Sequence, residues 1–424
     1  MPVARRRFHQ PPRFRRGRAV STSRRVFTMQ PHDRVPFHRP TLAAAAFEAV
    51  REVLSLGALT GGGARTAACH ALLRGRLPDT VPFLTTSCTD ALEMAVLLLE
   101  IRPGDEVVMP SWTFSSCANA VLLRGGVPVF VDVEPGTLNI DPARIPEALT
   151  PRTRAVLCVH YAGIACRMDD LRDLCTARGL ALIEDAAQAF GSTWRGRPLG
   201  GWGDLGAFSF HGTKNVGCGE GGALLVNRPD LVTRAEILWE KGTNRLDYAR
   251  NGRPHYDWVD IGSSFLPSEV TAAILEKQFE IADALTARRC AAWETYARLL
   301  APDAEGASVR MLDVPAPARH NGHIFAVRVG GRARRDRVMA FLAERGIETR
   351  THYRPLHASP AAARHGRAVG SLTVSEEAGD GLIRLPLDSH ITPAEQERVV
   401  ATLLDGLRQA DTAPLRQVSP ADAP

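Results

Sequence analysis

Short apolar runs alternate with longer segments of helical periodicity from about residue 83 onward. Short strands separated by helices of this length are typical of a mostly parallel sheet with helices on both faces. We therefore predict a large three-layer α/β domain. Its expected strands are 107–109, 127–133, 155–160, 180–183, 206–210 and 222–226, and its expected helices lie near 89–100, 115–123, 142–149, 167–178 and 229–240.

The pattern changes after about residue 290, which predicts a smaller α+β domain. The sequence Thr392-Pro393-Ala394-Glu395 has the form of a capping box with proline at the first helical position. We divide the chain into a large domain at 35–290 and a small domain at 291–410. Strands are expected in the small domain near 323–329, 349–353 and 383–387, and helices near 335–345 and 393–408.

The net charge of +6 belongs to the N-terminal end of the chain. Residues 1–28 contain nine arginines and no acid, so the remaining chain has a small negative net charge. We expect residues 1–34 to form a disordered arginine-rich extension and residues 411–424 a flexible tail. The predicted domains therefore have no basic character that would indicate nucleic-acid binding, and no apolar stretch is long enough for a membrane span.

The eight cysteines include no Cys-x-x-Cys pair and no Cys/His cluster at zinc spacing. Several lie in apolar segments, where cysteine behaves as a small hydrophobic residue. We expect a cytoplasmic protein without a metal.

Lysine is rare in this chain. Only three of the 52 basic residues are lysines, namely Lys214, Lys241 and Lys277. A GC-rich genome that favours arginine codons could explain the scarcity by chance. A lysine amine, however, can lose its proton and condense with an aldehyde, whereas a guanidinium cannot. Because Lys214 lies between a strand-like segment and a glycine cluster, we interpret it as the lysine that would hold pyridoxal 5′-phosphate. Lys277 is expected on a helix surface.

Pyridoxal phosphate also requires a carboxylate for its ring nitrogen. Asp185 follows an apolar strand, and Gln188, three residues later, is placed to hydrogen-bond the phenolic oxygen of the ring. The competing interpretation of Asp185 is an ordinary helix N-cap.

The phosphate and the ring face need partners as well. Small residues open a helix at 86–92, where free backbone amides favour an anion, and Ser209 precedes the lysine. Phe114 is our candidate for stacking on the ring, with Trp112 as the alternative and core packing as the competing explanation for both. The glycine cluster at 217–222 resembles a dinucleotide-binding loop. Such a loop precedes a helix, whereas this cluster precedes a strand, so we reject that interpretation.

These motifs resemble the DegT/DnrJ/EryC1/StrS family of sugar aminotransferases over about residues 35–408. The resemblance rests on Glu184-Asp185-Ala186-Ala187-Gln188, Ser209-Phe210-His211-Gly212-Thr213-Lys214-Asn215 and Gly219-Glu220-Gly221-Gly222. Within the family, the segments at 159–163, 240–245, 260–264 and 352–357 are most similar to those of TDP-4-amino-4,6-dideoxygalactose transaminases.

The resemblance implies the fold-type I architecture of pyridoxal phosphate enzymes and a homodimer with active sites at the interface. It implies glutamate and a sugar nucleotide as substrates, with Lys214 as the catalytic lysine and proton shuttle. Cofactor roles then fall to Asp185, Gln188, Ser209, Cys88, Thr89 and Phe114. The family's Asn-x-Arg pattern is replaced here by Ser264-Phe265-Leu266.

Substrate contacts are expected from two further segments. Lys241, Asn244 and Arg245 offer donors to the diphosphate of a sugar nucleotide, although an exposed helix terminus explains them equally well. His352 and Tyr353 are candidates for the sugar pocket. The sequence leaves open an aminotransferase for another keto-sugar nucleotide and, as a weaker alternative, a regulatory protein. A sugar dehydratase of this family would carry histidine in place of Lys214.

Overall fold

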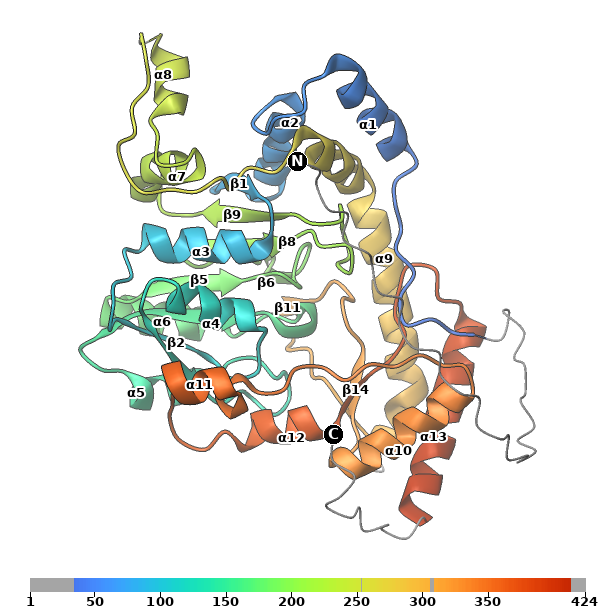
Figure 1. Ribbon diagram of the computed structural model, residues 1–424. Coiled ribbons are helices and arrows are strands. Elements are labelled where there is room, and N and C mark those ends of the chain that lie inside the picture. Colours follow the sequence, from blue (N-terminus) through green and yellow to red (C-terminus); the bar gives the residue numbers. More distant parts are fainter. Residues whose placement is uncertain (1–33, 253, 306–308, 413–424) are drawn as a thin grey trace, which may run out of the picture.

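The computed structural model describes residues 34–252, 254–305 and 309–412. Its largest feature is an eight-stranded mixed sheet with the order β1-β9-β8-β5-β4-β2-β3-β13 (Figure 1). Neighbours from β8 to β13 pair in parallel, and β9 is antiparallel to both β8 and β1. The strands are β1 (Val81–Thr85), β2 (Glu106–Pro110), β3 (Val127–Val131), β4 (Thr153–Val159), β5 (Ala181–Asp185), β8 (Leu205–Ser209), β9 (Gly222–Val226) and β13 (Arg367–Ala368).

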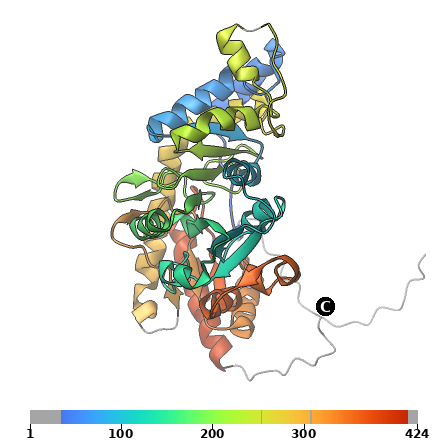
Figure 2. The same ribbon diagram turned by 90° about the vertical axis from the view of Figure 1, so that its left-hand side faces the viewer.

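Helices cover both faces of this sheet (Figure 2). Successive strand residues alternate between two cores: Val107 packs into one and Val108 into the other. One face is covered by α3 (Cys88–Leu98), α4 (Ser115–Leu122) and α7 (Val232–Trp239), and the other by α2 (Ala64–Arg76), α5 (Ile145–Ala148), α6 (Met168–Arg178) and α9 (Glu269–Glu305). The predicted three-layer α/β fold, of the fold-type I kind, is confirmed.

The C-terminal part forms a second core beside a three-stranded antiparallel sheet. Its central strand β12 (Ala326–Arg328) pairs with β10 (Arg310–Met311) and β14 (Leu382–Arg384). The predicted capping box is confirmed at α13 (Pro393–Thr412), where the Thr392 amide donates to Glu395 Oε2 (2.8 Å) and the Glu395 amide to Thr392 Oγ1 (3.2 Å). The accompanying helices are α10 (Arg332–Glu344) and α12 (Thr373–Gly381).

The strand predicted at 349–353 is wrong. Within the described chain this segment makes a single bridge, between Arg350 and Arg384, and then leaves the sheet edge. Departure from the sheet carries His352 and Tyr353 into a cavity, so burial at a site replaces strand pairing. The sequence predicts a helix around Lys277 but misses the extent of α9, which has 37 residues and runs continuously through residue 290.

The remaining elements connect and flank these layers. They are α1 (Ala45–Leu56), α8 (Arg245–Asn251), α11 (Pro360–His365), the small sheet of β6 (Thr193–Trp194), β7 (Arg197–Pro198) and β11 (Ala318–Arg319), and short 3-10 turns at Pro142–Arg144, Tyr161–Gly163, Pro229–Leu231 and Leu356–Ala358. The expected helix at 142–149 is thus a 3-10 turn followed by α5. Most of the predicted extension and tail lies outside the described residues. Within those residues, no helix combines the length and apolar character of a membrane crossing.

Candidate active site

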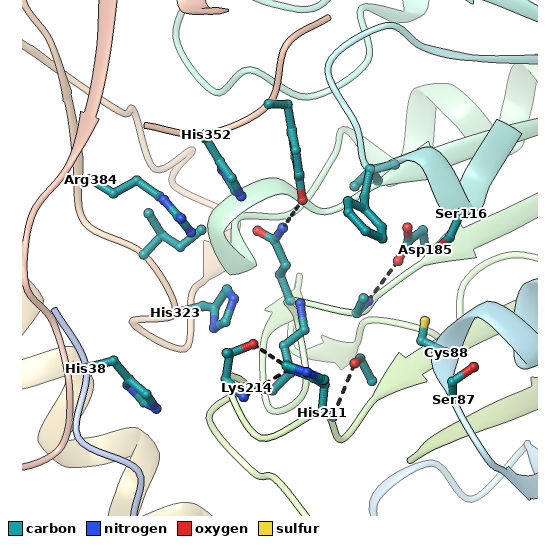
Figure 3. A pocket seen from close by; sticks show the side chains of 18 of the residues that line it. His38, Ser87, Cys88, Ser116, Asp185, His211, Lys214, His323, His352 and Arg384 are labelled. Atoms are coloured by element: carbon teal, nitrogen blue, oxygen red, sulfur yellow. Dashed lines mark hydrogen bonds between the residues drawn. The ribbon is translucent and has the colours of Figure 1, made fainter. Parts of the chain in front are cut away.

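A cavity of about 620 Å³ lies at the carboxyl ends of the parallel strands (Figure 3). Strands β5 and β8 end at Asp185 and Ser209, and parallel strands bring such ends to one edge of a sheet. A volume of this size suits a small molecule. The structure gathers here nine of the residues predicted from the sequence, which are Cys88, Thr89, Phe114, Asp185, Gln188, Ser209, Lys214, His352 and Tyr353.

Lys214 lies in the loop after β8 and points into this cavity (Figure 3). Its side-chain amine makes no hydrogen bond or ion pair within the described part of the chain. Burial lowers the pKa of the amine, whereas electrostatic interactions with Cys88 and Asp185 act in the opposite direction. A lysine that is half-buried, unpaired and more easily deprotonated is suited to attack a carbonyl carbon and to carry protons.

Asp185 presents a buried carboxylate, 6% exposed, to the same cavity. One oxygen accepts a hydrogen bond from the Ala187 amide (3.0 Å) and the other from the Cys117 thiol (3.0 Å). Each carboxylate oxygen has a second lone pair, so both retain capacity for a further donor. The carboxylate is therefore oriented by the protein and remains open to a protonated ring nitrogen.

Gln188 is oriented by two contacts. Its side-chain oxygen accepts from the Ala162 amide (2.7 Å), and its amide nitrogen donates to the Tyr353 hydroxyl (2.8 Å). The second N–H of that nitrogen has no partner among the described residues and lies at the cavity wall. This N–H fits the predicted hydrogen bond to a phenolic oxygen.

The N-terminus of α3 forms one end of the cavity. Ser87 caps the helix by accepting from the Asp90 amide (3.1 Å), while the Cys88 and Thr89 amides make no hydrogen bond in the described chain. Two free amides at the positive end of a helix dipole fit a phosphate, and Ser209 lines the same space.

A glycine is needed where β9 passes this helix end. A Cβ atom on Gly222 would lie 2.4 Å from the Ser87 carbonyl carbon and 2.5 Å from the Cys88 nitrogen. Because these neighbours are backbone atoms, they cannot turn away as a side chain would. The glycine therefore allows the strand to approach the proposed phosphate site closely.

We predict that Gly222→Ala destabilises the fold by about 1–3 kcal/mol, through overpacking at the α3 N-terminus. Gly75→Ala is the matched control: Gly75 lies within α2, and an added Cβ would meet nothing within 4 Å. The control is expected to stabilise the protein by roughly 0.5–1 kcal/mol. Urea denaturation of both variants measures the difference, and equal stability of the two would contradict the close approach.

The two candidate stacking residues differ in their exposure to the cavity. Phe114 lines the cavity and is 58% exposed, whereas Trp112 is 1% exposed and packs against Tyr161, His352 and Tyr353. Phe114 is therefore placed to cover a flat ligand, and Trp112 supports the aromatic residues behind it. His352 stacks on Tyr353 with 3.8 Å between ring centroids.

Sequence reasoning missed several lining residues from distant parts of the chain. His323 Nδ1 donates a hydrogen bond to Asn215 Oδ1 (2.8 Å), next to Lys214 in the sequence. Arg384 also faces the cavity (Figure 3), and its sequence signal is a lone charge within an apolar strand. His38 and Arg289 are two further lining residues that the sequence analysis did not identify.

Lys241, Asn244 and Arg245 do not line this cavity. Lys241 pairs with Glu240 (3.3 Å), and Asn244 accepts a hydrogen bond from the Asp257 amide (2.7 Å). They precede or begin α8, which stands out from the body of the molecule in Figure 1. Lys277 lies on α9 and pairs with Glu280 (2.6 Å).

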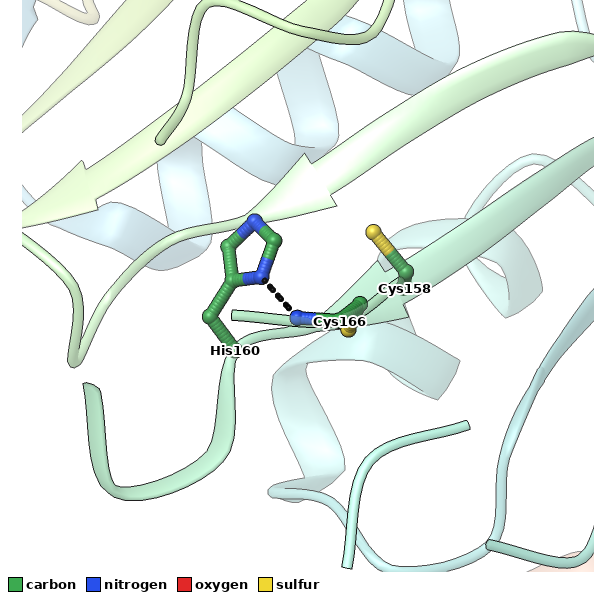
Figure 4. A group of neighbouring side chains, drawn as sticks. All are labelled: Cys158, His160 and Cys166. Carbon is green, nitrogen blue, oxygen red and sulfur yellow. Dashed lines mark hydrogen bonds between the residues drawn. The ribbon is translucent and has the colours of Figure 1, made fainter. Parts of the chain in front are cut away.

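Three buried residues that the spacing rules did not connect come together near the carboxyl end of β4: Cys158, His160 and Cys166 (Figure 4). Both imidazole nitrogens are already engaged, since Nδ1 accepts from the Cys166 amide (3.2 Å) and Nε2 lies 3.0 Å from Glu184 Oε2. The Cys166 thiol donates to the Val159 carbonyl (3.2 Å). These contacts describe a hydrogen-bonded core cluster, and we assign it no ligand.

Comparison with known proteins relates the chain and its fold to one family. A sequence profile described as the DegT/DnrJ/EryC1/StrS aminotransferase family matches residues 40–404. The structure of the aminotransferase TlmJ from Streptoalloteichus hindustanus is 32% identical, with 89% of this chain and 99% of that chain covered and a TM-score of 0.81. DesV from S. venezuelae, solved in complex with a ketimine intermediate, is 33% identical over 90% and 100% of the chains, with a TM-score of 0.79. The PMP form of Spr1654 from Streptococcus pneumoniae is 25% identical, with 89% of this chain and 99% of that chain covered and a TM-score of 0.81.

Proposed function

Because this chain belongs to the DegT/DnrJ/EryC1/StrS aminotransferase family, we propose that it transfers an amino group from glutamate to a nucleotide-linked 4-keto-6-deoxy sugar. The specific reaction proposed is conversion of TDP-4-keto-6-deoxyglucose to TDP-4-amino-4,6-dideoxygalactose. The observation that carries the proposal is the unpaired amine of Lys214 in one cavity with the open carboxylate of Asp185.

The enzyme is a pyridoxal-phosphate-dependent aminotransferase, and the residues present fit this cofactor. Asp185 fits the ring nitrogen, Gln188 the phenolic oxygen, and the α3 N-terminus with Ser209 the phosphate. When bound, the cofactor supplies an aldehyde for condensation with amines and an electron-withdrawing ring. Gly222 supports this fit, since a Cβ atom there would clash with the Ser87 and Cys88 backbone at the N-terminus of α3.

Lys214 then performs the proton transfers. With its pKa lowered by burial, the amine can take the proton from the α-carbon of glutamate and later return one to C4 of the sugar. Asp185 keeps the ring nitrogen protonated, since a fixed negative charge beside it favours the cation. Phe114 and Tyr353 reduce the access of water to the reacting atoms from the cavity wall.

We further propose a homodimer. Large apolar side chains are exposed on α1 and on the segment after α8, including Phe47 (75%), Leu56 (73%) and Trp258 (79%). Exposed apolar residues of this size are typical of protein contacts. Three residues do not line the cavity of their own subunit: Lys241, Asn244 and Arg245. In the dimer, they would contact substrate only in the cavity of the partner subunit.

Incubation of the purified enzyme with pyridoxal phosphate, glutamate and either TDP- or UDP-4-keto-6-deoxyhexose tests the proposed substrate. We expect an amino sugar from the TDP compound, with NMR showing the galacto configuration at C4. Product from the UDP compound alone would favour the alternative, an aminotransferase for another keto-sugar nucleotide in antibiotic or surface-glycan biosynthesis. Cofactor binding without any amino transfer would favour a regulatory protein.

A further inference from the structure

The first turn of α4 contacts residues on two sides of the cavity that would hold the cofactor. Ser116 shares a hydrogen bond with Thr89 (2.8 Å), and both side chains line the cavity. One residue later, the Cys117 thiol lies 3.0 Å from Asp185 Oδ2. Phe114, which is placed to cover a flat ligand, is the N-cap of the same helix. One short segment therefore touches the proposed partners of the ring face, the ring nitrogen and the phosphate.

The direction of the hydrogen bonds at Cys117 follows from counting protons. Its sulfur lies within hydrogen-bond distance of Asp185 Oδ2 (3.0 Å) and of the Thr113 hydroxyl (3.1 Å), and a thiol has one proton. An ionised carboxylate can only accept, so the thiol donates to Asp185. The Thr113 hydroxyl is then the donor to the sulfur. The result is a chain of hydrogen bonds that runs from Thr113 through Cys117 to Asp185.

This chain lies in the protein core. Thr113 is 1% exposed and Cys117 is 0% exposed. Burial, followed by the charge of Asp185, raises the pKa of the Cys117 thiol well above its ordinary value, so the sulfur keeps its proton near neutral pH. Because a group that accepts a hydrogen bond becomes a better donor, the contact with Thr113 strengthens the contact with Asp185.

The alternative is that Cys117 only fills space, as a small hydrophobic residue does. Cys69 on α2 is an example, since it is also 0% exposed and its thiol donates to a neutral backbone carbonyl, that of Ala272, at 3.3 Å. At Asp185 the situation differs. Among the described residues, its carboxylate accepts from the Ala187 amide on one oxygen and from Cys117 on the other. Loss of the thiol would leave Oδ2 without a protein donor and allow the carboxylate to rotate.

We propose that Cys117 is a positioning residue that holds the Asp185 carboxylate in the orientation that meets the ring nitrogen of the cofactor. This inference rests on the proposed function, which assigns Asp185 to that nitrogen. The Ala187 amide fixes one oxygen and Cys117 fixes the other, so two contacts set the plane of the carboxylate. A thiol is a weak donor, so it sets this direction and leaves most of the negative charge to the ring nitrogen.

The variants that test this role are Cys117→Ala and Cys117→Ser, with Cys69→Ala as the matched control. Equilibrium dialysis of the holoenzyme against pyridoxal phosphate measures the Kd of the cofactor. We expect the Kd to rise about 3- to 10-fold in Cys117→Ala, the effect of one lost hydrogen bond. Cys117→Ser keeps a donor and Cys69→Ala removes a thiol elsewhere in the core, so both should stay within about twofold of the wild type.

A second background separates positioning from packing. Asparagine at position 185 removes the charge that Cys117 would orient. In Asp185→Asn, the further change Cys117→Ala should therefore alter the Kd of the cofactor by less than about twofold. The same loss in both backgrounds would show that Cys117 acts by filling space, and would overturn the inference.

The S–H stretching band in the infrared spectrum reports the hydrogen bond without any measurement of activity. The band of Cys117 is the one that disappears in Cys117→Ser, and the band of Cys69 is the one that disappears in Cys69→Ala. We expect the Cys117 band at the lower frequency, because a charged acceptor makes the stronger hydrogen bond. In Asp185→Asn it should move to higher frequency.

A Cys117 band that does not move in Asp185→Asn would refute the positioning role, as would an unchanged Kd in a folded Cys117→Ala protein. The infrared measurement does not depend on Cys117→Ala, so it decides the question even if that variant fails to fold. Failure of the proposed function gives a different result: the wild type would bind pyridoxal phosphate and transfer no amino group, whatever the state of Cys117.

Discussion

Replacing Lys214 with alanine or arginine is expected to reduce amino transfer below about 10⁻⁴ of the wild-type rate, because the same amine attacks the cofactor and carries the protons. Arginine keeps the positive charge and removes both functions. Product formation from glutamate and the keto sugar is measured by chromatography. Retained turnover in either variant would remove Lys214 from the chemistry.

The covalent bond itself can be located with borohydride. At neutral pH, reduction of the holoenzyme followed by digestion should leave the pyridoxyl label on the peptide containing Lys214. Lys277 is the internal control, since hydrogen bonds with Glu280 and Glu276 raise its pKa and keep the amine protonated. The lowered pKa of Lys214 increases its neutral fraction at a given pH, so its labelling should begin at lower pH. Label on Lys277 instead would contradict this assignment.

Replacing Asp185 with asparagine is expected to lower the rate on the order of 100- to 1,000-fold. Asparagine keeps the shape and can still accept from the Ala187 amide, but it removes the charge that keeps a ring nitrogen protonated. The effect should fall mainly on the rate of each half-reaction, with a smaller effect on the affinity for glutamate. Stopped-flow absorbance of the cofactor measures both quantities.

Glu184 is the matched control for this variant. It precedes Asp185 on β5, but its carboxylate is 0% exposed and accepts from the amides of Gly200 (2.8 Å), Trp202 and Gly203 (both 2.6 Å). Glu184→Gln should therefore destabilise the fold by about 1–3 kcal/mol while the folded fraction keeps its rate. The opposite outcome, with a stable but inactive Glu184→Gln enzyme, would exchange the roles of the two carboxylates.

The sequence predicted much of the large sheet because each element carries its own signal. Six expected strands overlap β2, β3, β4, β5, β8 and β9, and the capping box begins α13 as predicted. Asp185 and Ser209 could be placed together because they follow neighbouring parallel strands, and such strands end at one edge. Lys214 stood out by its chemistry in a chain that otherwise uses arginine.

The tertiary structure decided which distant segments complete the cavity. His323 and Arg384 lie more than a hundred residues after Lys214, and nothing in their local pattern states which element they face. The segment 349–353 was expected to be a strand, yet it makes one backbone bridge, and its half-buried residues His352 and Tyr353 line the cavity. Likewise, only the folded structure showed that Phe114 lines the cavity, whereas Trp112 is buried.

The sequence by itself thus determined the alternating elements, the edge where they converge and the lysine with its carboxylate. Hydrophobic periodicity reports which side of an element is buried, and residue type reports what chemistry is available. Neither states which other element covers that side. For this reason only the folded chain could place Arg384 in the cavity with Lys214 and leave Lys241, Asn244 and Arg245 outside it.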